Sequence, residues 1–206
     1  MSRLLLVRHG DTELDSAHRY WGRTDVKLST DGLRQAERLR DRLAGEKIDA
    51  VDSSDLKRAL VTAETIASRH QLDVIPCAEL REIDFGNIEG LTYEEVSQLY
   101  PEFFTKFWIQ RVPNLRYPGG ENTGELNSRV SKFADRLKEH VAEETILIVA
   151  HRGPLAILIC QLLGVELQFR RQIRLDLASL SIVETYSQGA VVSLLNDTAH
   201  LRGVDE

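Results

Sequence analysis

Two histidines in this sequence stand at the ends of apolar runs that are typical of buried strands. His9 follows residues 4–7 and Arg8, and His151 follows residues 146–150. Ligands of open α/β sheets bind at the carboxyl ends of the strands, so both imidazoles are expected at one binding edge. Two imidazoles placed together can supply a nucleophile and its electrophilic partner.

The elements that must position these histidines alternate between strand-like and helical patterns. Residues 29–32 supply cap residues for a helix that runs to about Leu43, with apolar side chains on one face. A short strand over 48–51, a helix over 55–70 and a strand at 74–75 are expected next. The alternation predicts an α/β fold, a three-layer sandwich with a mostly parallel sheet flanked by helices.

Residues 92–125 interrupt this alternation. They contain Pro101, Pro113 and Pro118 and show no strand periodicity. We therefore expect a short lid-like insertion that lies over the sheet edge. Three elements are expected after it, namely an amphipathic helix over 125–141, an apolar helix over 154–163 and a terminal hairpin around 187–189.

The residues around both histidines resemble the histidine phosphatase superfamily, which is also called phosphoglycerate mutase-like. The segment from Leu6 to Glu13 is similar to the family's Arg-His-Gly-Glu-Thr signature, with Asp11 in place of the usual Glu. The resemblance covers the chain from residue 3 to about residue 195. The matching blocks are residues 6–13, 19–29, 32–36, 56–64, 80–91, 119–121 and 150–153.

The resemblance implies a role in phosphoryl transfer for each of five side chains. His9 is implied as the nucleophile that attacks phosphorus and becomes phosphohistidine. Arg8 and Arg58 are implied to grip the phosphoryl oxygens, and His151 to donate a hydrogen bond to the same oxygens. Glu82 is implied as the acid that protonates the leaving oxygen and as the base for water. We expect no cofactor and no metal ion, because the arginines and histidines supply the positive charge.

Further residues are assigned to substrate binding, and several depart from the family pattern. Asp15 stands where the family usually has Asn, whose amide can donate to phosphate, whereas an ionised carboxylate cannot. Trp21 replaces a commonly polar residue before Gly22. Arg152 follows His151 where a small residue is usual, and it either adds positive charge to the pocket or points outward.

Three functions are compatible with this pattern. The first is a phosphomonoesterase that acts on a small phosphorylated metabolite, with α-ribazole 5′-phosphate as one candidate, because residues 118–122 and 174–181 resemble α-ribazole phosphatases. The second is a phosphoglycerate mutase. It is disfavoured because the segment between Glu82 and His151 is short and weakly basic, too little to hold a second phosphate. The third is a catalytically silent protein that binds a phosphorylated ligand.

Four aromatic residues of the lid fall at helical spacing and have two interpretations. They either offer ring faces to a ring-bearing phosphomonoester or pack the lid onto the domain. The four residues are Phe103, Phe104, Phe107 and Trp108.

Length and charge limit the remaining function classes. The 206 residues suit one domain spanning 1–206, and a net charge of −6 offers no basic footprint for nucleic acid. No apolar run approaches membrane-spanning length and no signal peptide precedes Arg8, so we expect a cytoplasmic protein without membrane contact. Cys77 and Cys160 are expected as two buried thiols in a reducing compartment. Assembly as a homodimer is left open.

We expect Asp15→Asn to tighten the binding of inorganic phosphate several-fold without disturbing the fold. If the carboxylate faces the pocket, its removal relieves repulsion of the dianion, by about 1 kcal/mol after screening by solvent and neighbouring arginines. Calorimetric titration of both proteins with phosphate measures the change. Unchanged or weaker binding by the Asn variant would mean that Asp15 instead pairs with Arg19 or Arg23 and orients the loop.

Overall fold

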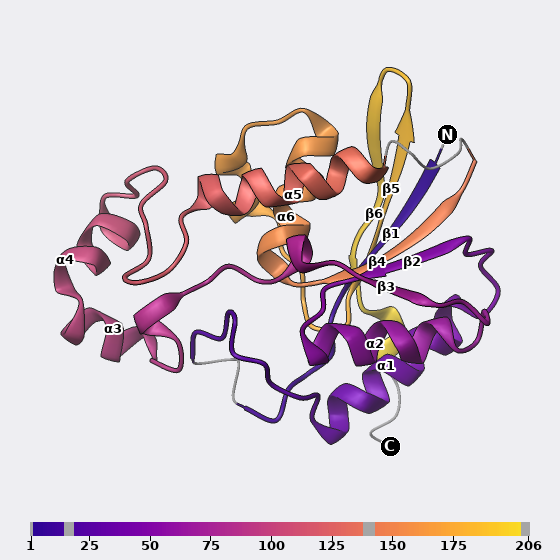
Figure 1. The fold of residues 1–206 in the computed structure, drawn as a ribbon, viewed down its shortest axis with the longest axis horizontal. Coiled ribbons are helices and arrows are strands. Elements are labelled where there is room, and N and C mark those ends of the chain that lie inside the picture. The colour runs from indigo at the N-terminus through magenta and orange to yellow at the C-terminus, as the bar shows by residue number, and fades with distance from the viewer. Residues whose placement is uncertain (1, 15–18, 138–142, 203–206) are drawn as a thin grey trace.

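The structure, a computed structural model, describes residues 2–14, 19–137 and 143–202. These residues form a six-stranded sheet in the order β3-β2-β4-β1-β5-β6 (Figure 1). β1 to β4 pair in parallel, whereas β5 and β6 run antiparallel as the terminal hairpin. The predicted α/β fold with a mostly parallel sheet is confirmed. The strands are β1 Ser2–Arg8, β2 Ala50–Ser53, β3 Val74–Pro76, β4 Thr145–Ala150, β5 Leu180–Tyr186 and β6 Gly189–Asp197.

Two pairs of helices cover the two faces of the sheet. In Figure 1, α5 and α6 lie on one side of the strands, and α1 and α2 lie on the other. Helix α1 begins where Ser29 accepts a hydrogen bond from the backbone N–H of Gly32, as the cap residues predict. The helices are α1 Thr30–Leu43, α2 Lys57–Ala67, α5 Thr123–Leu137 and α6 Arg152–Leu163.

Some helix bounds differ from the pattern-based prediction. α2 ends three residues before the predicted His70, and Gln71 shortly after it has a positive φ of 56° that no helix can continue through. α6 begins at Arg152, two residues earlier than predicted, directly after His151. Its first turn therefore belongs to the binding edge of the sheet.

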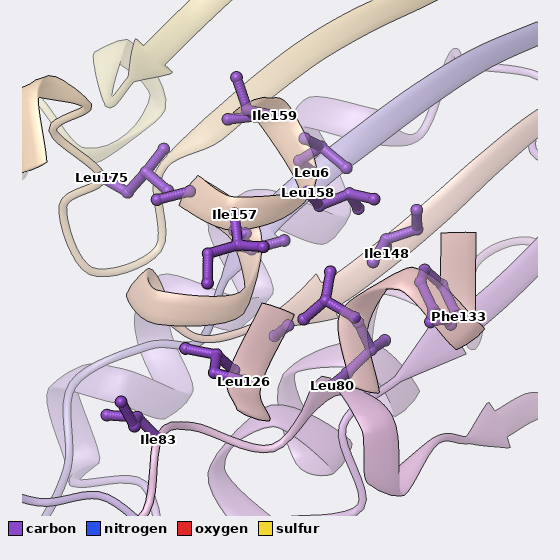
Figure 2. Close-up of a cluster of buried hydrophobic side chains, with 14 of the residues drawn as sticks. Leu6, Leu80, Ile83, Leu126, Phe133, Ile148, Ile157, Leu158, Ile159 and Leu175 are labelled. Carbon is purple, nitrogen blue, oxygen red and sulfur yellow. The ribbon is translucent and has the colours of Figure 1, made fainter. Parts of the chain in front are cut away.

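Side-chain alternation along β1 explains why the sheet is covered on both faces. Leu4 and Leu6 pack in the core under α5 and α6, whereas Leu5 and Val7 pack in the core over α1 and α2. All four side chains are buried. Figure 2 shows Leu6 and Ile148 of the strands together with side chains from α5 and α6. A strand buried on both faces reads as a continuous apolar run, which is the pattern that predicted it.

The lid consists of short helical segments joined by irregular chain. Figure 1 shows α3 and α4 at one end of the molecule, away from edge strand β6. The lid lies next to the carboxyl end of β1, because its aromatic side chains share a cavity with Arg8 and His9. Its helical segments are α3 Tyr93–Leu99, α4 Pro101–Phe104 and a π-helical turn, η3, at Thr105–Ile109.

Two further expectations concern the cysteines and membrane contact. Cys77 and Cys160 are both buried, and neither forms a disulfide. Within residues 2–14, 19–137 and 143–202, no helix has the length and apolarity needed to cross a membrane.

Candidate active site

His9 and His151 lie side by side because β1 and β4 pair in parallel and end in step. Arg8 pairs with Ala150 in the ladder, so the next residue of each strand is a histidine. The backbone N–H of His9 donates to the carbonyl of Ala150 at 3.1 Å. The two ring centroids are 4.9 Å apart, with the ring planes inclined at 58°. The pairing that the two apolar runs predict is therefore present.

His9 is arranged as a neutral imidazole with one nitrogen available. Its Nδ1 lies 2.7 Å from the carbonyl oxygen of Gly10, which can only accept, so Nδ1 carries the proton. Nε2 then bears the lone pair. Burial, followed by the charges of Arg8 and Arg58, lowers the pKa of His9 well below its ordinary value. A neutral imidazole with a free Nε2 is the form that can attack phosphorus.

Both ring nitrogens of His151 are engaged by the protein. Nδ1 accepts a hydrogen bond from Nε of Arg58 at 3.3 Å, and Nε2 lies 2.8 Å from Oγ of Ser54. Because Arg58 can only donate, the proton of His151 resides on Nε2 and points at Ser54. Burial, then the charge of Arg58, lowers the pKa of His151 well below its ordinary value. In this arrangement His151 holds Arg58, and its donor is directed to Ser54 rather than to a phosphoryl oxygen.

Arg58 is fixed from three directions. Besides Nε, its Nη1 donates to the carbonyl of Thr24 at 2.8 Å and its Nη2 to the carbonyl of Gly22 at 2.7 Å. Three of its five N–H groups are thereby used, and two are left for a ligand. A Cβ atom at Gly22 would lie 2.2 Å from the carbonyl oxygen of Ile83, so this close approach requires glycine. Gly22 therefore orients Arg58 through its backbone.

The described residues satisfy only part of the hydrogen-bonding capacity of Arg8, and none of their carboxylates forms an ion pair with it. Nη1 donates to the carbonyl of Leu175 at 2.7 Å, but the buried Nε has no hydrogen-bond partner among the residues described. A buried donor without an acceptor costs about 1–3 kcal/mol. Burial lowers the pKa of Arg8, and the carboxylate of Glu82 opposes that shift. An anion in the cavity would supply the counter-charge that Arg8 lacks.

Glu82 is held at the cavity wall by backbone N–H groups. Oε1 accepts from Ile83 at 2.8 Å, and Oε2 accepts from Gly153 in the first turn of α6 at 3.2 Å. A Cβ atom at Gly153 would lie 2.2 Å from Oε1 of Glu82. A side chain at position 153 would therefore displace the Glu82 carboxyl group from the place it occupies here.

A partly buried ion pair supports the segment that carries Glu82. Arg129 donates to the carbonyl oxygens of Glu79, Arg81 and Glu82 at 2.5–2.9 Å and pairs with Glu121 at 3.0 Å. Glu121 also accepts from Arg23 at 2.9 Å. Removing one partner of such a pair is destabilising, because the other charge stays partly buried without a counter-charge. The block at 119–121 therefore acts on the site indirectly.

A cavity of about 570 Å³ opens at these residues. Arg8, His9, Arg58 and Glu82 line it, and so do Trp21 and the exposed Arg152. Asp15 lies outside the described residues. Within residues 2–14, 19–137 and 143–202, no group of three or more His, Cys, Asp or Glu side chains is arranged to hold a metal ion.

The aromatic residues of the lid divide between the two interpretations. Phe107 and Trp108 line the cavity, whereas Phe103 and Phe104 do not. Phe103 stacks on Phe107 with centroids 5.3 Å apart, and Phe104 meets Tyr93 edge to face at 4.7 Å. One pair therefore faces the ligand space and the other packs behind it.

Several residues of the site were not identified from the sequence. Ser54 lies two residues before the matching block at 56–64, and nothing in its local pattern shows that it binds His151. Arg129 lies on an amphipathic helix, where a lone arginine is usually solvated. Arg170 and Arg171 come from a 3-10 turn, η4 (Leu167–Gln172), and reach the cavity only through the packing of η4 on α6. No local signal in the sequence marks them.

Comparison with known proteins agrees with this geometry. The family described as histidine phosphatase superfamily (branch 1) matches residues 4–198. Phosphoserine phosphatase 1 of Hydrogenobacter thermophilus is 35% identical over 98% of this chain and 95% of the relative. The probable phosphoglycerate mutase GpmB of Proteus mirabilis is 33% identical over 99% and 97%. A putative alpha-ribazole-5′-P phosphatase structure from Escherichia coli aligns with a TM-score of 0.88 and 31% identity over 95% and 96%.

The chain belongs to the histidine phosphatase superfamily. The match covers almost the whole sequence. It includes all of β2 to β6 and all of β1 except its first two residues. Members of this family include phosphatases and mutases, so the family leaves the particular reaction to be argued from the site.

We expect both active-site imidazoles to stay neutral at a pH where an ordinary imidazole is protonated. An imidazole with the ordinary pKa of 6.5 is about 90% protonated at pH 5.5. Burial and neighbouring arginines move protonation of His9 and His151 to lower pH. Imidazole ¹⁵N chemical shifts, assigned with His9→Ala and His151→Ala, measure the titration. A midpoint near 6.5 for either ring would contradict this electrostatic description.

Proposed function

We propose that this protein is a phosphomonoesterase that forms a phosphohistidine at His9 and acts on a small phosphorylated metabolite. One observation carries the proposal. A buried, neutral His9 with a free Nε2 lines a cavity together with two arginines that have no carboxylate partner among the described residues. A phosphate dianion supplies both an electrophile for Nε2 and a counter-charge for Arg8 and Arg58.

The reaction has two steps that share one carboxyl group. In the first, Nε2 of His9 bonds to phosphorus, the ester P–O bond breaks, and the leaving oxygen takes the proton of Glu82. In the second, water attacks the phosphohistidine, gives its proton to the Glu82 carboxylate, and His9 leaves as a neutral imidazole. Arg8 and the two remaining N–H groups of Arg58 stabilise the charge on the equatorial oxygens.

The reaction type does not by itself identify the substrate, so we propose only a class of substrate. Relatives whose names specify phosphoserine and α-ribazole phosphate are similar to this chain to comparable degrees. Trp21, Phe107 and Trp108 in the cavity wall suit a ring-bearing ester such as α-ribazole 5′-phosphate. A hydrolysis screen over α-ribazole 5′-phosphate, phosphoserine, sugar phosphates and phosphoglycerates selects among them.

A phosphoglycerate mutase is the second candidate, and the arginines in the cavity wall favour it. Lys106 and Arg116 of the lid pair with Glu102 and Glu125 and stay outside the cavity. Other elements nevertheless add arginines to the cavity wall, so the site is more basic than the lid alone indicates. The argument against a mutase from weak basicity of the lid is therefore incomplete.

We expect His9→Ala to abolish hydrolysis of phosphomonoesters and Glu82→Gln to slow alkyl phosphate hydrolysis by about 10²–10⁴-fold. The loss in the Gln variant shrinks for aryl phosphates, whose leaving oxygen needs no proton. Steady-state kinetics on 4-nitrophenyl phosphate and an alkyl phosphate, in excess chelator, give both numbers. Glu64→Gln, on the exposed face of α2, is the matched control.

Equal losses for aryl and alkyl esters would remove Glu82 from the acid role. Inactivation of the wild-type protein by chelator, reversed by a divalent ion, would overturn a mechanism that relies on the arginines for charge. Phosphate binding without any turnover would favour the silent binding protein instead.

We expect release of phosphate to outrun isomerisation of phosphoglycerate. A mutase must keep water from its phosphohistidine while the intermediate reorients. Here Trp108, which lines the cavity, is 40% exposed, so water reaches this part of the cavity wall. An enolase-coupled assay with 3-phosphoglycerate and its bisphosphate primer, run beside a phosphate-release assay, compares the rates. Isomerisation faster than phosphate release would establish the mutase.

A further inference from the structure

The cavity contains a second group of arginines besides Arg8 and Arg58. We call Arg111, Arg152, Arg170 and Arg171 the distal arginines. They come from the middle of the lid, the first turn of α6 and the turn η4, three separate segments of the sequence. Their shared feature is that all four line one cavity in a chain whose net charge is −6.

None of the distal arginines forms an ion pair with a carboxylate of the described residues. Elsewhere in the chain, arginines near the cavity do find acidic partners. Arg19 pairs with Glu95 at 3.1 Å, and Arg23 pairs with Glu121 at 2.9 Å. Acidic side chains are therefore available around this cavity, yet the distal arginines are kept apart from them.

Two distal arginines are held in place by interactions that leave their charge unneutralised. Arg171 lies over the ring of Phe107, with its guanidinium carbon 4.8 Å from the ring centroid. Nη2 of Arg170 donates to the hydroxyl of Thr123 at 2.9 Å. Burial, then the charge of Arg171 and more weakly that of Arg152, lowers the pKa of Arg170. Four positive charges thus line one cavity, and the charge on Arg170 is partly desolvated, which favours an anion.

Arg170 and Arg171 differ from Arg8 and Arg58 in the element that carries them and in their contacts with Thr123 and Phe107. Arg152 connects the two groups of arginines, because its charge contributes, after burial, to the lowered pKa of Arg8 as well as to that of Arg170. Apolar and aromatic groups, including Ile83, Phe107 and Leu126, line the same cavity. A ligand held at His9 can therefore present a second group to Arg170 and Arg171 across an apolar wall.

We propose that Arg170 and Arg171, assisted by Arg152 and Arg111, form a subsite for a second anionic group on the substrate, a carboxylate or a second phosphate. The inference rests on the proposed phosphomonoesterase and narrows its substrates to phosphomonoesters with a second negative charge. Guanidinium groups recognise both anions through paired N–H donors. A monoester with a neutral remainder, such as α-ribazole 5′-phosphate, leaves this subsite without a partner.

Binding to the full-length His9→Ala protein tests the subsite without turnover. Two matched ligand pairs are titrated by calorimetry. The first pair is 3-phosphoglycerate and glycerol 3-phosphate, which differ by a carboxylate. The second is fructose 1,6-bisphosphate and fructose 6-phosphate, which differ by a phosphate. We expect the ligand with the second anion to bind about 10- to 100-fold more tightly in at least one pair, and that pair identifies the anion.

Substitutions then assign the preference to the distal arginines. In the His9→Ala background, Arg171→Gln and Arg170→Gln each reduce the affinity ratio about fivefold or more. Arg69→Gln, an exposed arginine after the end of α2, removes the same charge and keeps the ratio. Because Arg170 also bonds Thr123, the exposed Arg171 provides a variant that does not depend on that contact.

Equal binding within both pairs, or a ratio that persists when both arginines are replaced together, would overturn the subsite. Failure of the proposed function is a separate result. It would appear as absent hydrolysis of 4-nitrophenyl phosphate by the wild-type protein, whereas the affinity ratios report on the subsite alone.

Discussion

The parallel pairing of β1 with β4 is the constraint on which the rest of the site depends. Because the ladder ends with Arg8 opposite Ala150, it places His9 and His151 in ring contact in a fully desolvated position. Two protonated imidazoles beside two arginines would be very costly there. Burial and positive charge therefore keep both rings neutral. Neutrality is what the proposed nucleophile His9 needs, and it lets His151 accept a hydrogen bond from Arg58.

The site brings positive charges together, and no carboxylate of the described residues pairs with Arg8 or Arg58. Arg58 is oriented by Gly22, Thr24 and His151, none of which carries a counter-charge. Glu82 is held by backbone N–H groups, and Arg129 with Glu121 braces its segment from behind. Rigid positioning without charge compensation is costly to the folded protein, and this kind of preorganisation stabilises a phosphoryl transition state.

The sequence predicts the elements near the histidines better than those farther away. The run at 4–7 reads as a strand buried on both faces, and the motif blocks locate Arg58 and Glu82 correctly in one cavity. Tertiary packing decides the rest. Arg170 and Arg171 reach the cavity because η4 folds back on α6, and no periodicity encodes that contact. The proton of His151 points at Ser54 because Arg58 occupies the other ring nitrogen, a consequence of geometry that residue types alone do not reveal.

Trapping the covalent intermediate tests the central claim most directly. The wild-type protein is mixed with an aryl phosphate and quenched in alkali, which preserves phosphohistidine, and its peptides are analysed by mass spectrometry. The mechanism predicts a phosphoryl group on the peptide that contains His9. It also predicts that the label disappears in His9→Ala. A phosphoryl group on the peptide with His151, or rapid hydrolysis with no covalent label on His9, would contradict the account.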